Sequence, residues 1–134
     1  MCSACLLGFA CRYDGKAKTD ERIVAMVDQV TFVPFCPEQM GGLSTPRLQA
    51  EERDGRIVDA EGHDVTENYE RGAAAAVAMA KLSGAKRAIM RIKSPSCGVG
   101  QVFDGTFSDS LRPGDGVTTR ALKAAGVEVI SQQS

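Results

Sequence analysis

The sequence predicts an α/β fold: a single three-layer domain spanning residues 1–134, with a small mostly parallel sheet, flanking helices and short β-hairpin insertions. Short apolar segments typical of buried strands alternate along the chain with amphipathic segments of helical length. This alternation favours parallel strand pairing through right-handed crossover connections. Two Asp-Gly pairs flanked by strand-like residues indicate hairpin turns outside the main sheet. No repeat or linker divides the chain.

The first third of the chain predicts a strand, a helix and a second strand. Residues 1–5 form the first strand, and Asp20 caps a helix whose apolar residues, up to Val30, give a mostly buried stripe. The second strand, 31–35, is rich in Val and Phe. It ends before Pro37, because proline has no N–H with which to continue a sheet.

The middle of the chain predicts a hairpin followed by the longest helix. The turn at Asp54-Gly55 joins two strands over 48–60. A helix is expected over about 66–83, since Asp64 followed three residues later by Glu67 resembles a capping box. Gly84, directly after this segment, is a natural helix stop.

The last third predicts two more strands of the main sheet, a hairpin and a helix. A buried strand is expected at 87–92, and a hairpin over 101–107 with its turn at Asp104-Gly105. A final helix begins at Asp115 or Thr118, and a strand over 127–130 completes the sheet.

Composition excludes several classes of function. The net charge of −1 argues against a nucleic-acid or membrane partner held by bulk electrostatics, and two Tyr and five Phe give little surface for base stacking. No apolar stretch approaches the roughly 20 residues that span a bilayer. The N-terminus lacks the features of a signal peptide, so a cytoplasmic protein is expected.

Five cysteines are the main chemical feature of the sequence. An odd number of cysteines in a cytoplasmic chain serves packing, metal binding or catalysis better than disulfides. Cys5, Cys36 and Cys97 each lie in or just after a predicted strand, and Cys97 sits in a Ser/Pro/Gly loop. If those strands are parallel, the three thiols converge at the sheet edge where open α/β folds build their sites.

The residues alone leave the use of these thiols open. Cys2 and Cys5 form one C-x-x-C pair with no second pair to close a zinc site, and the single histidine, His63, lies in a polar turn. Soft thiolates select zinc, copper(I) or iron–sulfur clusters. Three thiolates on a 4Fe–4S cluster would leave one iron open to substrate, whereas isolated cysteines also pack well as small apolar residues.

A series of motifs narrows these alternatives. In order they are Ser3-Ala4-Cys5-Leu6-Leu7-Gly8, Arg12-Tyr13-Asp14-Gly15, Cys36-Pro37-Glu38, Gly41-Gly42-Leu43-Ser44-Thr45-Pro46-Arg47, Asp64-Val65-Thr66, Ser94-Pro95-Ser96-Cys97-Gly98 and Phe103-Asp104-Gly105-Thr106-Phe107. Together they resemble domain-of-unknown-function family 523, whose characterised branch is the thiouracil desulfidase (TudS) group. The resemblance covers nearly the whole chain.

The resemblance implies an oxygen-sensitive 4Fe–4S cluster, one readily lost from a sample prepared in air, held by Cys5, Cys36 and Cys97. Relatives commonly have aliphatic residues where this chain has Cys2 and Cys11, which are therefore assigned to packing, although both lie close enough to Cys5 to compete as ligands or oxidise with it. The implied enzyme is a non-redox desulfidase of small thiolated compounds, such as 2-thiouracil to uracil. A thiocarbonyl sulfur would bind the open iron, which acts as a Lewis acid.

Such a reaction needs proton donors and acceptors near the sulfur. Glu38 and Ser96 are the catalytic candidates because each lies next to an expected ligand, although Glu38 could simply pair with Arg47 and Ser96 could cap a turn. Candidates for binding a small thiolated substrate are Arg12, Asp14, Lys16 and Arg47.

Two other hypotheses stand beside the desulfidase. One is a metal or cluster protein without catalysis, and the other is a thiol-redox protein that cycles Cys2 and Cys5. Neither the true substrate nor the oligomeric state is predicted.

Overall fold

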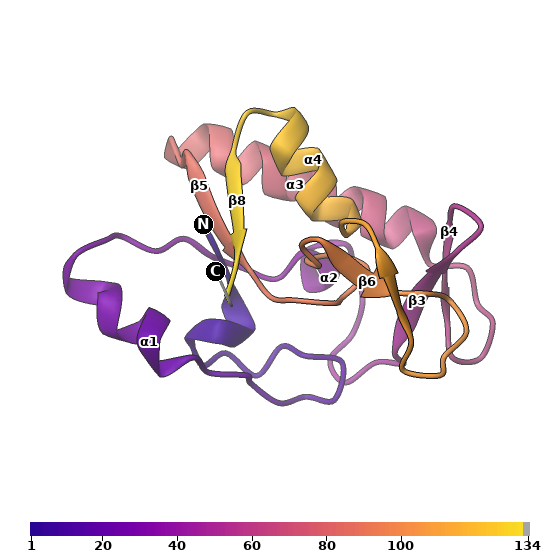
Figure 1. The fold of residues 1–134 in the computed structure, drawn as a ribbon. Coiled ribbons are helices and arrows are strands. Elements are labelled where there is room, and N and C mark those ends of the chain that lie inside the picture. Colours follow the sequence, from indigo (N-terminus) through magenta and orange to yellow (C-terminus); the bar gives the residue numbers. More distant parts are fainter. Residues whose placement is uncertain (133–134) are drawn as a thin grey trace.

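A four-stranded parallel sheet in the order β2-β1-β5-β8 forms the centre of the computed structural model, which describes residues 1–132 (Figure 1). Its strands are β1 (Cys2–Ser3), β2 (Pro34–Phe35), β5 (Arg87–Met90) and β8 (Glu128–Ser131). Cys2 pairs with Pro34 on one side and with Ile89 on the other. Crossovers between parallel strands pass over the faces of the sheet, which is where the helices lie.

Helical elements cover both faces of this sheet, as the sequence predicts. The long helix α3 (Thr66–Ser83) and α4 (Val117–Ala124) pack together on one side, while α1 (Glu21–Val24) lies on the other (Figure 1). Along β5, Ala88 and Met90 join the core beneath α3 and α4, whereas Ile89 packs with the opposite cluster. This two-residue alternation confirms a three-layer α/β fold.

Two glycines let the short helix α2 (Pro37–Met40) approach α3 closely. A Cβ built on Gly72 would lie 2.0 Å from the carbonyl oxygen of Pro37, and one on Gly41 would lie 2.0 Å from that of Asn68. The Asn68 amide and the Arg71 guanidinium both donate to the Gly41 carbonyl at 2.9 Å. The position of α2 is therefore fixed by backbone packing against α3.

Two antiparallel hairpins, β3 (Ala50–Arg53) with β4 (Arg56–Asp59) and β6 (Gln101–Phe103) with β7 (Leu111–Pro113), lie at one end of the molecule (Figure 1). The tight turn predicted at Asp54-Gly55 is present, with both residues at positive φ. The tight turn predicted at Asp104-Gly105 is wrong, because the chain continues in a loop before pairing at Leu111.

A buried carboxylate explains that longer loop. Glu51 of β3 is almost fully buried, and its Oε1 accepts hydrogen bonds from the backbone N–H groups of Gly105 at 3.0 Å and Phe107 at 3.1 Å. Arg53 adds bonds to the Gly105 carbonyl at 2.7 and 2.9 Å. The loop therefore folds around a side chain of the other hairpin, which a local turn signal does not encode.

The N-terminal elements are shorter than predicted. The expected strand 1–5 is a strand only over Cys2–Ser3, and Ala4–Leu7 forms the 3₁₀ turn η1, which ends at a left-handed Gly8. The helix that Asp20 caps runs as α1 for one turn and continues as the 3₁₀ turn η2 (Ala25–Asp28).

The starts of the two longer helices also differ in detail. Helix α3 begins at Thr66 as predicted, but through Asp64 accepting from the Thr66 N–H at 2.9 Å and not through a capping box with Glu67. Helix α4 begins at Val117, between the two predicted starts, while Asp115 accepts from the Gly100 N–H at 2.8 Å. Within residues 1–132, no helix has the length and apolarity to cross a membrane.

Candidate functional site

The three cysteines expected to converge line one pocket at the carboxyl ends of the strands. Cys5 lies in η1 directly after β1, Cys36 precedes the first turn of α2 after β2, and Cys97 lies in the loop after β5. Cys11 lines the same pocket, so four thiols from four segments meet there. Parallel strands end at one edge of a sheet, which explains how residues 92 positions apart come together (97 − 5).

Burial and mutual contact raise the pKa of three of these thiols, those of Cys11, Cys36 and Cys97. Burial, as the largest effect, raises the pKa of Cys97 to about 12. The pKa of Cys36 is raised well above its ordinary value, first by a hydrogen bond with the Cys11 thiol and then by burial. A hydrogen bond with the Cys36 thiol lowers the pKa of Cys11. A hydrogen bond with Cys5 and burial outweigh this effect, so the pKa of Cys11 is raised to about 11. Metal ligation requires thiolates, so binding at this pocket releases protons.

Arg12 supplies a donor that suits an anionic group in this pocket. Its Nε is buried and has no hydrogen-bond partner among residues 1–132, while its Nη2 lies 3.5 Å from an Asp14 carboxylate oxygen. An orphaned buried donor is costly unless an acceptor reaches it, and the sulfurs of iron–sulfur clusters accept such bonds. The soft thiol set and the orphaned N–H therefore both fit a cluster.

The pocket is not arranged around a single ion. Among the residues that the structure describes, no three His, Cys, Asp or Glu side chains converge as ligands of one metal ion. The thiols line a pocket together with Arg12, Glu38 and Arg47.

Glu38 and Arg47 form a buried ion pair on the wall of the same pocket. Arg47 donates from Nε to Glu38 Oε2 at 2.8 Å and makes a second contact with the same oxygen through Nη2. The Arg47 side chain is only 7% exposed and the Glu38 side chain only 14%. Nη2 also donates to the Cys11 carbonyl at 2.8 Å. One arginine thus fixes both a carboxylate beside Cys36 and the loop that carries Cys11.

Comparison with known proteins assigns the chain to a family. A family model described as 2-thiouracil desulfurase matches residues 1–134. The chain belongs to this family. It is 45% identical over an alignment of 140 residues to the uncharacterized protein YbbK of Bacillus subtilis (strain 168), covering 97% of this chain and 93% of that protein.

A solved structure agrees with the family assignment. The chain superposes with a TM-score of 0.93 on the [4Fe-4S]-dependent thiouracil desulfidase TudS, at 38% sequence identity, covering 98% of this chain and 89% of TudS. Both the fold and the expected family resemblance are confirmed.

Not every residue expected at the site reaches the pocket of this family member. Cys5, Cys36, Cys97, Glu38, Arg12 and Arg47 line it. Ser96 is fully buried behind it, with its hydroxyl 2.9 Å from that of Thr118. The Asp14 carboxylate accepts from the Lys16 N–H at 3.0 Å in a local turn, and both residues are exposed and do not line the pocket.

The structure adds residues that the sequence analysis missed. Ser94 and Arg91 line the thiol pocket, and the Ser94 hydroxyl accepts from the Cys97 N–H at 2.7 Å. Ser94 belongs to the same Ser-Pro-Ser loop as Ser96. A serine hydroxyl commonly caps a turn by hydrogen bonding to a backbone N–H a few residues away, which is the available sequence signal for Ser94. The signal for Arg91 is a single charge interrupting the apolar run 88–92.

Cys2 does not line this pocket. It is fully buried in β1, and its Sγ lies 3.5 Å from the Ser3 carbonyl oxygen. A thiol that exchanges with Cys5 must be accessible, so the position of Cys2 favours packing over a redox pair.

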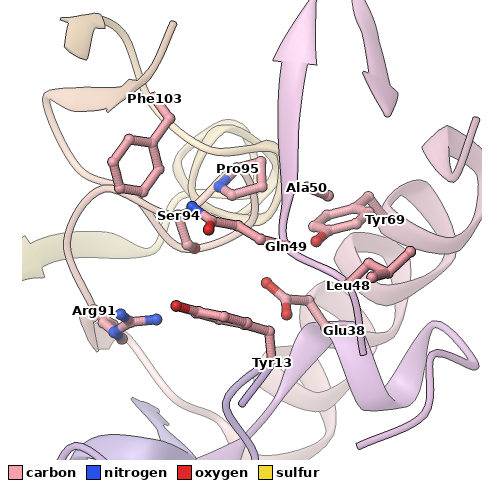
Figure 2. Close-up of a pocket in the computed structure, with 10 residues that line it drawn as sticks. All are labelled: Tyr13, Glu38, Leu48, Gln49, Ala50, Tyr69, Arg91, Ser94, Pro95 and Phe103. Atoms are coloured by element: carbon pink, nitrogen blue, oxygen red, sulfur yellow. The ribbon is translucent and has the colours of Figure 1, made fainter. Parts of the chain in front are cut away.

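A second pocket adjoins the thiol pocket (Figure 2). The two share Glu38, Arg91 and Ser94, so these three residues stand on a common wall.

Proposed function

We propose that this chain is an iron–sulfur-dependent desulfidase that converts a small thiolated compound, such as 2-thiouracil, into its oxo counterpart. The observation that carries this proposal is the meeting of Cys5, Cys36 and Cys97 in one pocket beside Glu38. The family assignment supports it, as does the likeness to the [4Fe-4S]-dependent thiouracil desulfidase TudS.

Cys5, Cys36 and Cys97 would hold the cluster, each from the end of a different strand. When bound, the cluster supplies an iron without a protein ligand as a Lewis acid for the soft thiocarbonyl sulfur. Arg12 Nε–H would be available to donate to this anionic group, because no protein acceptor among residues 1–132 engages it. Cys11 contributes contact with Cys36 and is not needed as a ligand in this assignment.

Glu38 is suited to accept the proton of the attacking water. The reaction forms a C–O bond and breaks a C–S bond, with one water consumed and hydrosulfide released, so it needs no electron donor. The Glu38 carboxylate lies on the wall shared by the two pockets, and Arg47 fixes its orientation through Oε2. Its second oxygen has no hydrogen bond to residues 1–132 and can face the water.

Ser94 fits the second proton-handling role better than Ser96. Its hydroxyl lies on the common wall and accepts from the Cys97 N–H, which leaves its own proton to donate. The hydroxyl of Ser96 is engaged with Thr118 in the core. We therefore assign proton transfer near the leaving sulfur to Ser94.

The test is turnover of 2-thiouracil by the anaerobically reconstituted protein and by Glu38→Gln. Glutamine keeps an acceptor for Arg47 but is not a base, so we expect an unchanged cluster spectrum and turnover lower by about 10²–10⁴-fold. Glu70→Gln, an exposed carboxylate on α3, serves as the matched control. Wild-type turnover by Glu38→Gln with a full cluster would remove Glu38 from the mechanism, and no uracil from the loaded wild type would contradict the proposed function.

A further inference from the structure

The pocket in Figure 2 has the composition of a site for a flat ring. The aromatic rings of Tyr13 and Phe103 and the buried Pro95 supply apolar surface on its walls. Aromatic and proline faces pack well against a planar heterocycle and reject bulky tetrahedral groups.

Four polar side chains of this pocket are left free by the rest of the protein. The hydroxyls of Tyr13 and Tyr69, the Gln49 amide and the Arg91 guanidinium have no hydrogen bond or ion pair with residues 1–132. In Figure 2, the Gln49 amide points into the middle of the pocket beside Ser94, and the Tyr13 hydroxyl points toward Arg91. Arg47, by contrast, is saturated by Glu38, Thr45 and main-chain carbonyls. Half-buried polar groups without partners in a pocket are groups that a ligand can satisfy.

Gln49 determines the kind of ring edge that fits. A primary amide presents one donor and one acceptor side by side, which is the complement of an N–H next to a C=O in a cyclic lactam. The amide is neutral, so it recognises the lactam without requiring an ionised ligand. Arg91 carries only donors and requires an acceptor, a carbonyl or thiocarbonyl, on the ring position that faces it.

The shared wall orients such a ring. Glu38, Arg91 and Ser94 line both pockets, so the edge of the ring nearest these residues is also the edge nearest the thiols. A ring held by Gln49 at one edge therefore directs another edge toward the cysteines.

We infer that this second pocket is the ring-binding site of the desulfidase and that Gln49 is a specificity-determining residue that reads the lactam edge of a small planar thiolated heterocycle. The inference rests on the proposed function. It implies that open-chain thioamides and rings without an N–H beside a C=O are poor substrates.

The experiment compares Gln49→Leu with Gln101→Leu, which removes an exposed glutamine from β6. Each anaerobically loaded protein is assayed with 2-thiouracil, and uracil binding is measured separately by calorimetry. We expect Gln49→Leu to raise KM and the uracil Kd about tenfold or more, with kcat within about threefold of wild type and an unaltered cluster spectrum. Gln101→Leu should match wild type in every quantity.

A second variant guards against a folding defect in Gln49→Leu. Gln49→Glu keeps the shape but loses the donor, so uracil binding should weaken to a similar extent, whereas Gln49→Asn should retain part of it. Equal uracil affinity in wild type, Gln49→Leu and Gln49→Glu would overturn the inference while leaving the desulfidase intact. Loss of uracil binding in Gln49→Leu would support it even if the loaded wild type releases no sulfide, a result that overturns only the proposed function.

Discussion

Replacing Gly72 by alanine has two opposing effects on stability: it raises helix propensity, and it introduces a steric clash with α2. At a free position inside a helix, Gly→Ala stabilises a protein by roughly 1 kcal/mol. At Gly72 the new Cβ would lie 2.0 Å from the carbonyl oxygen and 2.8 Å from the carbonyl carbon of Pro37. Both atoms are backbone and cannot move without shifting α2. Overpacking of this kind costs about 3 kcal/mol, so we expect a net loss of about 2 kcal/mol in the free energy of unfolding.

The assay is urea denaturation of cluster-free protein under reducing conditions. Ala74→Gly, at an exposed position of the same helix, is the control and should lose about 1 kcal/mol through propensity alone. Since α2 carries Glu38 and follows Cys36, Gly72→Ala should also reduce iron uptake on reconstitution. A Gly72→Ala protein that is more stable than wild type by about 1 kcal/mol would refute the close helix crossing.

Two further predictions concern buried groups. Arg47→Met should lower the free energy of unfolding by about 3 kcal/mol in urea titrations, because it leaves the Glu38 carboxylate buried without its partner. Burial, the largest effect, raises the pKa of Cys2 from 9.0 to about 11. The native thiol therefore keeps its proton while the unfolded thiol loses it. The resulting fall in stability between pH 9 and pH 11 should be shallower in Cys2→Ala.

Each of these has an outcome that contradicts it. Arg22→Met removes an exposed arginine paired with Asp20 and should not measurably change the free energy of unfolding. An equal loss of stability in Arg22→Met and Arg47→Met would show that burial does not strengthen the Arg47–Glu38 pair. Equal pH slopes for wild type and Cys2→Ala would show that the Cys2 thiol does not resist ionisation.

The sequence predicted the parts of the fold that depend on local pattern. The apolar run before Cys97 and the long alanine-rich helix were identified because their periodicity is strong and their ends carry glycine or serine signals. Parallel strand pairing predicted that Cys5, Cys36 and Cys97 converge. The three residues do line one pocket, although β1 is only two residues long. The 3₁₀ turn after β1 still delivers Cys5 to the sheet edge.

The missed features depend on contacts between distant segments. Glu51 shapes the loop at Gly105 from another hairpin, and neither residue's neighbours signal this. Ser94 and Ser96 flank Pro95 in one loop, and only the packing against Thr118 shows which hydroxyl turns into the core. Gln49 precedes β3, outside every recognised motif, and is found at the site because the start of its hairpin and the loop after β5 line one pocket.

The most direct test of the account is to count iron and acid-labile sulfide in anaerobically reconstituted wild type, Cys97→Ser and Cys2→Ser. We predict about four irons and four sulfides per chain in wild type and in Cys2→Ser, with broad visible absorption, and failure to hold a complete cluster in Cys97→Ser. Full cluster loading in Cys97→Ser, or no iron uptake by wild type, would contradict the claim that the thiol pocket is a cluster site.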